Sequence, residues 1–437
     1  MRRALSVLAI IAVIVIVILA GWYFSRNRGS PSQEEQPSAT TPAKLPPVPA
    51  FSGGKSSAGN QTTGGQGTVG GPNGTASRFG VVVQNPIAAY YITPQNAVLL
   101  VQPDGVVAQV VGTNQTVLSD KKIDGLLRAS FSADGQKALV VLGDQNNPET
   151  RVFDIATKTW RTLSSDIKAP VWSPNDERIA FLSSNSSTSF SVIATLDLKN
   201  AKAQAVPILQ IYAQDLVLDW TGKSEVVVSE KSSSYAPGSV WRLDLTTKNM
   251  TPLATDLSGA LLSWSGEAQR GALFTATPAN RGGNLSIIQS DGRVTSRLMI
   301  VTIPTKCTFL SEFVTPTTTA SSTTSSTTST KKTAKTKAPQ PKEVFSLVCG
   351  FPQNVQDFNL NAEPDAYFEH KFYSEDSLYK IDLGSGVLTN LYPENSSYVF
   401  DATQLSIVNN RLFFVSRYDS KLYALDLGKY VTPPPSL

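Results

Sequence analysis

Apolar and polar residues alternate along most of this chain in short runs, and the runs recur in a fixed order. Each repeat begins with an apolar strand that ends in an aromatic residue, then a polar turn and a second apolar strand, as in "VWSPNDERIAFLS" (171–183). The aromatic positions Phe131, Trp172, Trp220 and Trp264 are 41, 48 and 44 residues apart. Turns such as "SADG" and "SPND" between β-branched or aromatic runs predict tight β-hairpins.

A third strand, which ends in Asp followed by an aliphatic residue, and a short fourth strand complete the repeat. The aspartates are Asp154, Asp197, Asp244, Asp382 and Asp426. Four short strands in each repeat of 40–50 residues predict an all-β propeller, here with seven blades over residues 79–430, although six or eight blades stay open. The segment "FGVVVQ" (79–84) fits either the inner strand of the first repeat or the missing outer strand of the last, which would close the ring.

A different pattern opens the chain. Residues 4–24, "ALSVLAIIAVIVIVILAGWYF", contain no charge and would form a helix of about 31 Å, enough to cross a bilayer. We expect an uncleaved transmembrane anchor over residues 4–25, with a cytoplasmic N-terminus and an extracytoplasmic propeller; a cleaved signal peptide and a buried helix are the alternatives. Residues 26–78, rich in Ser, Pro and Gly, predict a disordered stalk.

Charge and composition exclude several classes of site. The net charge is +4, but many basic residues lie in the first 55 residues and in 331–342; without those segments 27 basic residues face 32 acidic ones, a net charge of about −5. This balance argues against a nucleic-acid partner, which needs a concentrated basic surface. The only histidine is His370, so a His-rich metal site is excluded. We expect no cofactor, because the chain has neither a calcium-loop motif nor a Gly-rich phosphate loop.

Two sets of residues are candidates for a functional surface. Acidic residues close to the predicted inner strands could line the channel of the propeller; they are Asp215, Asp219, Glu312 and Asp401. The long loop between the second and third strands of the sixth repeat is rich in aromatic residues, and these either pack locally or meet a partner. They are Phe358, Tyr367, Phe368, Phe372 and Tyr373.

The two cysteines are predicted to form a disulfide. Aligning "KCTFLS" with "APVWSP" and "SLVC" with "RIAF" places Cys307 and Cys349 opposite each other on neighbouring antiparallel strands. Two separate buried thiols are the alternative. A disulfide would imply an oxidising compartment. The tract between them, residues 315–342, consists of Thr, Ser, Lys, Ala, Pro and Gln with hardly any apolar residue, so we expect it to be a disordered insertion at the tip of this hairpin.

The motif "WSPNDERIAF" with a later "LDL" resembles the WD-like propeller repeat of TolB-like proteins and of the propeller domains of prolyl-oligopeptidase relatives. The resemblance covers about residues 79–430 and implies the propeller fold. TolB-type proteins carry an α/β domain before the propeller, where this chain has its stalk. The peptidases carry a hydrolase domain with a G-x-S-x-G motif, which this sequence does not contain.

Together these features predict a binding or scaffolding module of a cell envelope. The expected partner is an envelope protein, a peptide or a glycan. The alternative is an enzyme, a propeller-type hydrolase or lyase with acidic residues at its channel. Two or more titratable groups with shifted pKa values at the channel mouth would favour the enzyme.

Overall fold

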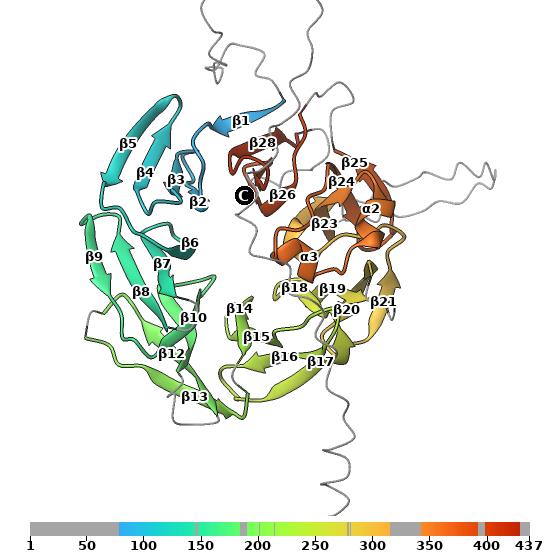
Figure 1. Ribbon diagram of the computed structural model, residues 1–437, viewed down its shortest axis with the longest axis horizontal. Coiled ribbons are helices and arrows are strands. Elements are labelled where there is room, and N and C mark those ends of the chain that lie inside the picture. Colours follow the sequence, from blue (N-terminus) through green and yellow to red (C-terminus); the bar gives the residue numbers. More distant parts are fainter. Residues whose placement is uncertain are drawn as a thin grey trace, which may run out of the picture. The chain divides into compact units, whose positions relative to one another are not determined.

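The computed structural model describes residues 78–428, apart from residues 145–146, 184–189, 201, 214, 278, 280, 315–341 and 392–397. This part of the chain forms seven four-stranded antiparallel sheets, arranged as the blades of a ring (Figure 1). The predicted seven-bladed β-propeller is therefore confirmed. The expected anchor (4–25) and nearly all of the expected stalk (26–78) lie outside the described residues. Within the described part, no helix has both the length and the apolar character needed to span a membrane.

Each blade runs from an innermost strand to an outermost one. Blade 1 consists of β2 (Ala89–Ile92), β3 (Val98–Val101), β4 (Val107–Val111) and β5 (Asn114–Ser119). Blade 2 consists of β6 (Leu126–Phe131), β7 (Lys137–Asp144), β8 (Asn147–Asp154) and β9 (Thr159–Thr162). Blade 3 consists of β10 (Ile167–Trp172), β11 (Arg178–Ser183), β12 (Ser191–Asp197) and β13 (Val206–Ile211). Blades 4 and 5 consist of β14 (Leu216–Trp220), β15 (Glu225–Glu230), β16 (Pro237–Asp244), β17 (Met250–Ser258); and β18 (Leu261–Ser265), β19 (Arg270–Ala276), β20 (Gly283–Gln289), β21 (Val294–Arg297).

Blade 6 is preceded by the 3-10 helix η1 (Pro304–Lys306) and interrupted by two short helices, α2 (Val355–Leu360) and α3 (Asp365–Phe368). Its strands are β22 (Cys307–Val314), β23 (Lys342–Pro352), β24 (Asp376–Asp382) and β25 (Leu388–Asn390). Blade 7 consists of β26 (Ala402–Val408), β27 (Arg411–Ser416), β28 (Leu422–Asp426) and, as its outermost strand, β1 (Phe79–Val83).

The position of β1 settles how the ring closes. Phe79 pairs with Leu425, and Val83 pairs with Leu422, so the first strand of the propeller completes the last blade. Of the two placements that the sequence allowed for residues 79–84, the structure shows the second. The two ends of the propeller are thereby held in one sheet.

Neighbouring blades bury each other's apolar faces. Leu139 of blade 2 packs with Ile179 and Phe181 of blade 3, and all three are almost completely buried. A single four-stranded sheet would leave such side chains in water, so burial against the neighbouring blade is the main driving force for the ring. The aromatic residues at the ends of the inner strands belong to these layers: Trp220 and Trp264 are buried.

The recurring aspartate at the end of the third strand has a local structural role. The side chain of Asp244 accepts hydrogen bonds from the backbone N–H groups of Thr246 and Thr247, both at 2.8 Å. Asp382 accepts from the N–H groups of Gly384 and Ser385 in the same way. These Asx turns fix the connection between the third and fourth strands, which explains why the pattern repeats.

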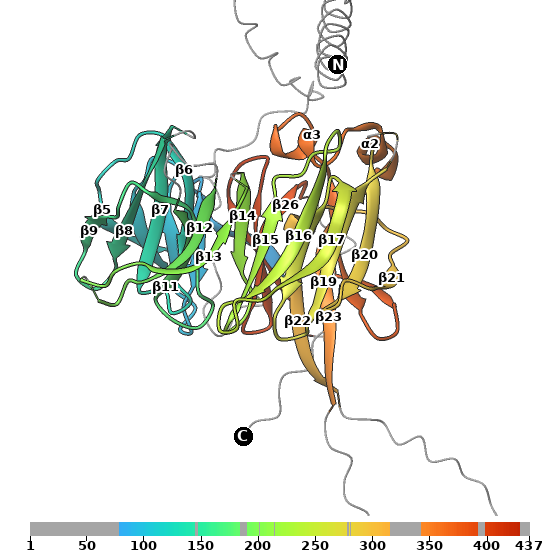
Figure 2. The same cartoon turned by 90° about the horizontal axis from the view of Figure 1, so that it is seen from below.

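The ring has two ends. The loop face carries the connections between blades and the loops between second and third strands, including α2 and α3. The hairpin face carries the turns between first and second strands, and Phe79 begins there, beside Leu425. Figure 2 shows α2 and α3 at one end of the ring and the β22–β23 hairpin pointing away from the other. The expected insertion (315–342) follows this hairpin, whose strands pair as far as Val314 and Lys342; residues 315–341 lie outside the described part.

Candidate functional site

Cys307 and Cys349 form the predicted disulfide at the start of blade 6. The two residues are direct partners on β22 and β23, with a Cα–Cα distance of 4.1 Å, and their Sγ atoms are bonded. The alignment of this hairpin with the one in blade 3 was therefore correct. The disulfide ties the innermost strand of blade 6 to its neighbour directly below the loop face.

A fully buried lysine lies next to this disulfide. Lys306, the last residue of η1, donates hydrogen bonds from Nζ to Asp376 Oδ1 (2.7 Å), Asp401 Oδ1 (2.8 Å) and Ser374 Oγ (2.6 Å). These partners come from the beginning of β24 and from the connection to β26. Burial opposes the charge on the lysine, but the two carboxylates outweigh burial and raise the pKa of Lys306. The lysine thus joins blades 6 and 7 through charge-assisted hydrogen bonds.

Arg417 extends the cluster towards the loop face. Its Nη1 donates to Asp401 Oδ2 and its Nη2 donates to the backbone oxygen of Tyr367, both at 2.7 Å. The guanidinium also stacks on the ring of Tyr367, 3.8 Å from its centroid, and contacts the ring of Tyr373. Arg417 therefore holds α3 and the following loop onto blade 7.

A second buried carboxyl group lies under α3. Glu363 is fully buried, and its Oε2 accepts a hydrogen bond from the N–H of Tyr367, whereas Oε1 has no partner among the described residues. Burial raises the pKa of Glu363 to about 7, with a partly offsetting effect of Lys306 and Arg417. With Glu363 protonated, the two positive charges of Lys306 and Arg417 balance the two negative charges of Asp376 and Asp401.

The raised pKa of Glu363 predicts a pH-dependent stability. The folded protein holds this proton to about pH 7, but the unfolded chain holds it only to about pH 4.5. The stabilisation is therefore complete below pH 4.5 and is lost as the pH rises through 7, a change of about 3 kcal/mol. Glu363→Gln keeps the neutral form at every pH. We expect it to unfold like the wild type at pH 5 and to be more stable at pH 8 in urea titrations.

The matched control is Glu369→Gln, which removes an exposed carboxylate from the same loop. Glu369 pairs with Lys371 on the surface, so the free energy of unfolding of Glu369→Gln should stay close to that of the wild type at both pH 5 and pH 8. A Glu363→Gln chain with the same pH profile as the wild type would contradict the assignment of the proton to Glu363.

The long loops of blades 4 and 6 meet on the loop face, as expected for loops at equivalent positions. The N–H and Oγ of Ser234 both donate to Asp365 Oδ2, at 2.6 and 2.7 Å. The backbone N–H of Gly282, in blade 5, donates to the oxygen of Asn361. We call residues 353–375, which lie across these blades, the cap. Its two helices were not predicted from the sequence; Asn354 begins α2 by accepting N–H hydrogen bonds from Gln356 and Asp357.

The five aromatic residues of the cap divide into two groups. Phe358 and Tyr367 are buried, and Phe372 is partly buried against the same core cluster. Phe368 and Tyr373 remain exposed, by 50% and 38%. Phe358, Tyr367 and Phe372 pack onto blades 5 and 6 and hold the cap in place, whereas a contact with a partner stays a prediction for the exposed pair. His370 is exposed, and its Nδ1 lies 3.2 Å from the hydroxyl oxygen of Tyr373.

The four candidate acids do not share one environment. Asp215 is exposed in a connection on the loop face. Glu312 and Asp401 are buried rather than exposed to the channel: Glu312 pairs with Lys380 on β24, and Asp401 belongs to the Lys306 cluster. Only Asp219 lies on an innermost strand with its side chain exposed, and its nearest opposite charge is that of Arg128 on β6.

Arg128 and Asp219 are accessible to solvent yet surrounded by protein, as expected for side chains in a channel. Burial raises the pKa of Asp219, and the charge of Arg128 partly offsets this effect. Burial likewise lowers the pKa of Arg128. The guanidinium forms no hydrogen bond and no ion pair with any described residue. Arg128 thus places in the channel a guanidinium without a hydrogen-bond acceptor among the described residues, with Asp219 as its nearest opposite charge.

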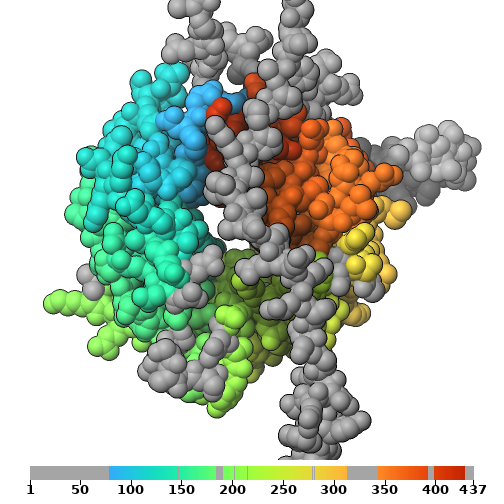
Figure 3. Space-filling view, viewed as in Figure 1, coloured from blue at the N-terminus to red at the C-terminus, as the bar shows by residue number. Residues whose placement is uncertain are grey.

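Two neighbouring cavities lie along the wall of the channel. The channel cavity, of about 450 Å³, lies along β2 and β6 and is lined by Tyr90, Pro103, residues 126–131 and Gln404. The rim cavity, of about 320 Å³, opens beside the cap and is lined by Tyr367, Phe368, His370 and Arg417, among others. Ala88 and Gln404 line both cavities, so the two lie next to each other. Figure 3 shows an opening at the centre of the ring.

Backbone irregularities lie along this path. Gln404 has a positive φ of 52°, in a segment where the pairing of β26 with β27 shifts register. The pairing of β6 with β7 shifts between Leu126 and Arg128. Bulges redirect side chains and are frequent next to functional sites. Arg128 and Gln404, which lie at these irregularities, both line the channel cavity.

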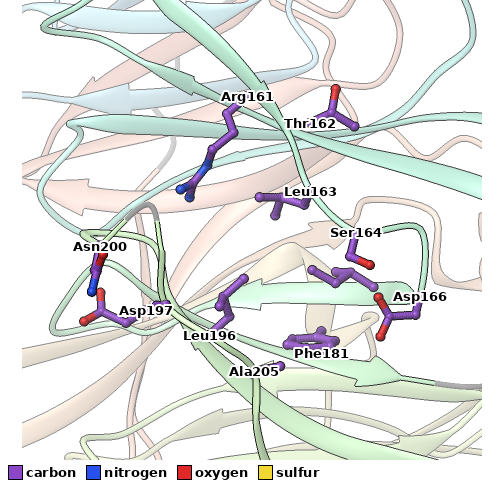
Figure 4. A pocket seen from close by; sticks show the side chains of 12 residues that line it. Arg161, Thr162, Leu163, Ser164, Asp166, Phe181, Leu196, Asp197, Asn200 and Ala205 are labelled. Atoms are coloured by element: carbon purple, nitrogen blue, oxygen red, sulfur yellow. The ribbon is translucent and has the colours of Figure 1, made fainter.

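A third cavity lies between the outer parts of blades 2 and 3. It has a volume of about 240 Å³ and is lined by both apolar and charged side chains. Figure 4 shows Asp166 and Asp197 at opposite ends of this cavity, with Leu163, Leu196 and Phe181 between them. Asp166 already accepts a hydrogen bond from the hydroxyl of Ser183. Asp197 accepts one from the backbone N–H of Lys199. The polar groups do not converge, so this cavity is a weaker candidate than the channel.

Within the described residues, no group of three or more His, Cys, Asp or Glu side chains is placed to hold a metal ion. The residues that sequence analysis missed are Lys306, Asp376, Glu363, Arg417 and Arg128. Each is a single charged residue in an ordinary segment. The feature that distinguishes Arg128 is the shift in strand register next to it, and this shift is not visible in the residue pattern.

Comparisons with known proteins identify no family and find distantly similar solved structures. No family model matches the chain, and no curated protein matches it in sequence. Among solved structures, the propeller domain of the Trilobed protease from Pyrococcus furiosus is 13% identical, with a TM-score of 0.44 over 70% of this chain and 83% of that one. Oligogalacturonate lyase from Vibrio parahaemolyticus is 10% identical, with a TM-score of 0.47 over 80% of this chain and 92% of that one. TolB from Acinetobacter baumannii is 12% identical, with a TM-score of 0.33 over 79% of this chain and 63% of that one. At such distances we carry no function over to this chain.

Proposed function

We propose that this chain is a membrane-anchored, extracytoplasmic β-propeller that binds an envelope protein, peptide or glycan at the loop-face end of its channel. The observation that carries the proposal is a pair of neighbouring cavities that share Gln404, one lined by the exposed Phe368 and the other by Arg128. Concave sites with mostly apolar walls and a few convergent polar groups are typical ligand sites. An exposed aromatic side chain at the entrance of such a site is a typical contact residue.

Two further features support the location and the orientation. The Cys307–Cys349 disulfide favours an oxidising compartment, as expected for an extracytoplasmic domain. The chain begins the propeller at Phe79 on the hairpin face, so the loop face lies at the end of the ring opposite to the point of attachment.

Site-specific photo-cross-linking tests this function. A p-benzoylphenylalanine residue at position 368 is expected to give a discrete cross-linked product when the full chain is irradiated in the cells that make it. The matched control is the same residue at position 294, because Val294 is equally exposed (51% against 50%) but lies on β21, the outer strand of blade 5. No discrete product at position 368, or the same product at both positions, would contradict a partner site at the rim.

A further inference from the structure

The channel contains hydrogen-bond donors for which the described part of the protein provides no acceptor. The guanidinium of Arg128 has five N–H donors, and none of them has an acceptor among the described residues. A buried donor without an acceptor costs about 1–3 kcal/mol, but Arg128 is exposed to solvent, so its N–H groups face water rather than protein acceptors. Water in the channel reduces this cost but provides no structural reason for an arginine at this position.

The surroundings of Arg128 leave room for an acceptor. The channel cavity is lined by residues 126–131 and by Tyr90. The hydroxyl of Tyr90 is already used, because it donates to the backbone oxygen of Gln404 (2.6 Å) and lies within hydrogen-bond distance of Ser406. The side chain of Gln404 donates to the oxygen of Ala88. Arg128 is therefore the one strong donor that this cavity offers to a ligand.

We propose that Arg128 anchors a ligand through a single carboxylate, the C-terminal carboxylate of a peptide that enters through the rim cavity. This inference rests on the proposed function and names its ligand chemistry. A planar carboxylate matches the two parallel N–H donors of a guanidinium. The negative charge of Asp219 nearby disfavours a dianion such as phosphate more than a monoanion.

The charge distribution favours a peptide end over an acidic glycan. A polyanionic chain would need several bases along its path, but the channel cavity is lined by one, Arg128. The basic residue of the rim cavity, Arg417, is buried and already hydrogen-bonded to Asp401 and Tyr367. The rest of the path is lined by Leu127, Phe131, Tyr367 and Phe368, which suit the side chains of an extended peptide.

The test uses the full chain in detergent micelles and two pools of N-acetylated tetrapeptides with randomised sequence. One pool has free C-terminal carboxylates and the other is amidated; retention after equilibrium dialysis is measured by mass spectrometry. We expect the wild type to retain the free-acid pool at least tenfold better than the amidated pool. Arg128→Gln should lose this preference, and Arg128→Lys should keep part of it, because it keeps the charge but not the paired donors.

Two further variants separate recognition from folding. Arg293→Gln removes an exposed arginine of a hairpin-face turn and should retain the pool like the wild type. Asp219→Asn removes the repelling charge and should increase retention of the free-acid pool two- to fivefold, an effect that a purely structural role of the site would not produce. Arg128→Gln is expected to keep the melting temperature of the wild type, since Arg128 has no partner to lose.

Equal retention of both pools by the wild type, or unchanged retention by Arg128→Gln, would overturn the proposal. So would a hyaluronan tetrasaccharide that is retained while the peptides are not, which would identify an acidic glycan as the ligand. If cross-linking from position 368 persists while the free-acid pool is not retained, the ligand chemistry is wrong but the binding function stands. If there is neither a cross-link from position 368 nor retention of the free-acid pool, the binding function is rejected as well.

Discussion

Replacing Lys306 with methionine is expected to destabilise the propeller by about 3–5 kcal/mol, the usual cost of removing one partner of a buried ion pair. Methionine fills a similar volume but leaves the carboxylates of Asp376 and Asp401 without their shared cation. Arg417 still reaches Asp401, so the uncompensated charge falls mainly on Asp376, whose side chain is fully buried. The measurement is urea unfolding of the full chain in micelles, monitored by tryptophan fluorescence.

The pH dependence and a double variant identify the cause. At low pH Asp376 can protonate, so the loss caused by Lys306→Met should be smaller at pH 5 than at pH 8. Adding Asp376→Asn to Lys306→Met removes the uncompensated charge and should restore at least half of the lost stability. Lys122→Met, which removes an exposed lysine near Asp104, serves as the control and should change stability by less than about 0.5 kcal/mol. A Lys306→Met chain as stable as this control would show that the cluster does not hold blades 6 and 7 together.

The fold was predictable because each blade is encoded locally. Hairpin turns, strand alternation and the Asx turn after residues such as Asp244 all lie within one repeat, so a pattern of 40–50 residues defines the unit. The closure of the ring was not decided, because the pairing of Phe79 with Leu425 joins opposite ends of the propeller. The disulfide was predicted because the register of one repeat could be transferred to another.

The candidate site was less predictable, for a geometric reason. Both faces of an innermost strand are covered by neighbouring blades, so an acid on such a strand is not automatically in the channel. Glu312, which shares a face of β22 with the buried Leu310, is directed towards the layer between blades 6 and 7. Two of the residues that line the channel, Arg128 and Gln404, lie where the backbone departs from regular pairing, whereas Asp219 lies on a regularly paired strand. A non-glycine residue with positive φ leaves no trace in a hydrophobic pattern.

The Lys306 cluster was missed for a different reason. Its members come from positions 306, 376, 401 and 417, in segments separated by loops and by the 315–341 tract. Nothing in any single segment indicates a buried charge, since isolated charged residues next to strands are usually solvated. Only the folded ring brings these residues together, and they in turn fix the cap that forms the rim cavity.

Replacing both Cys307 and Cys349 with alanine is expected to cost about 4 kcal/mol of unfolding free energy. The bond joins residues 42 positions apart and restricts the unfolded chain, so its removal raises the entropy of the unfolded state. Reductant should shift the wild-type urea transition to that of the double-alanine chain and leave the latter unchanged.

The length of the enclosed loop provides the sharper test. Val314 and Lys342 pair directly, so residues 315–341 can be replaced by an Asn-Gly turn without altering the strands. The disulfide would then close a loop of roughly 17 residues, and its contribution should fall to about 3 kcal/mol. Comparing the double-alanine substitution in the long and short chains measures this difference of about 1 kcal/mol. An equal or larger loss in the short chain would mean that the bond stabilises the folded hairpin itself rather than restricting the unfolded chain.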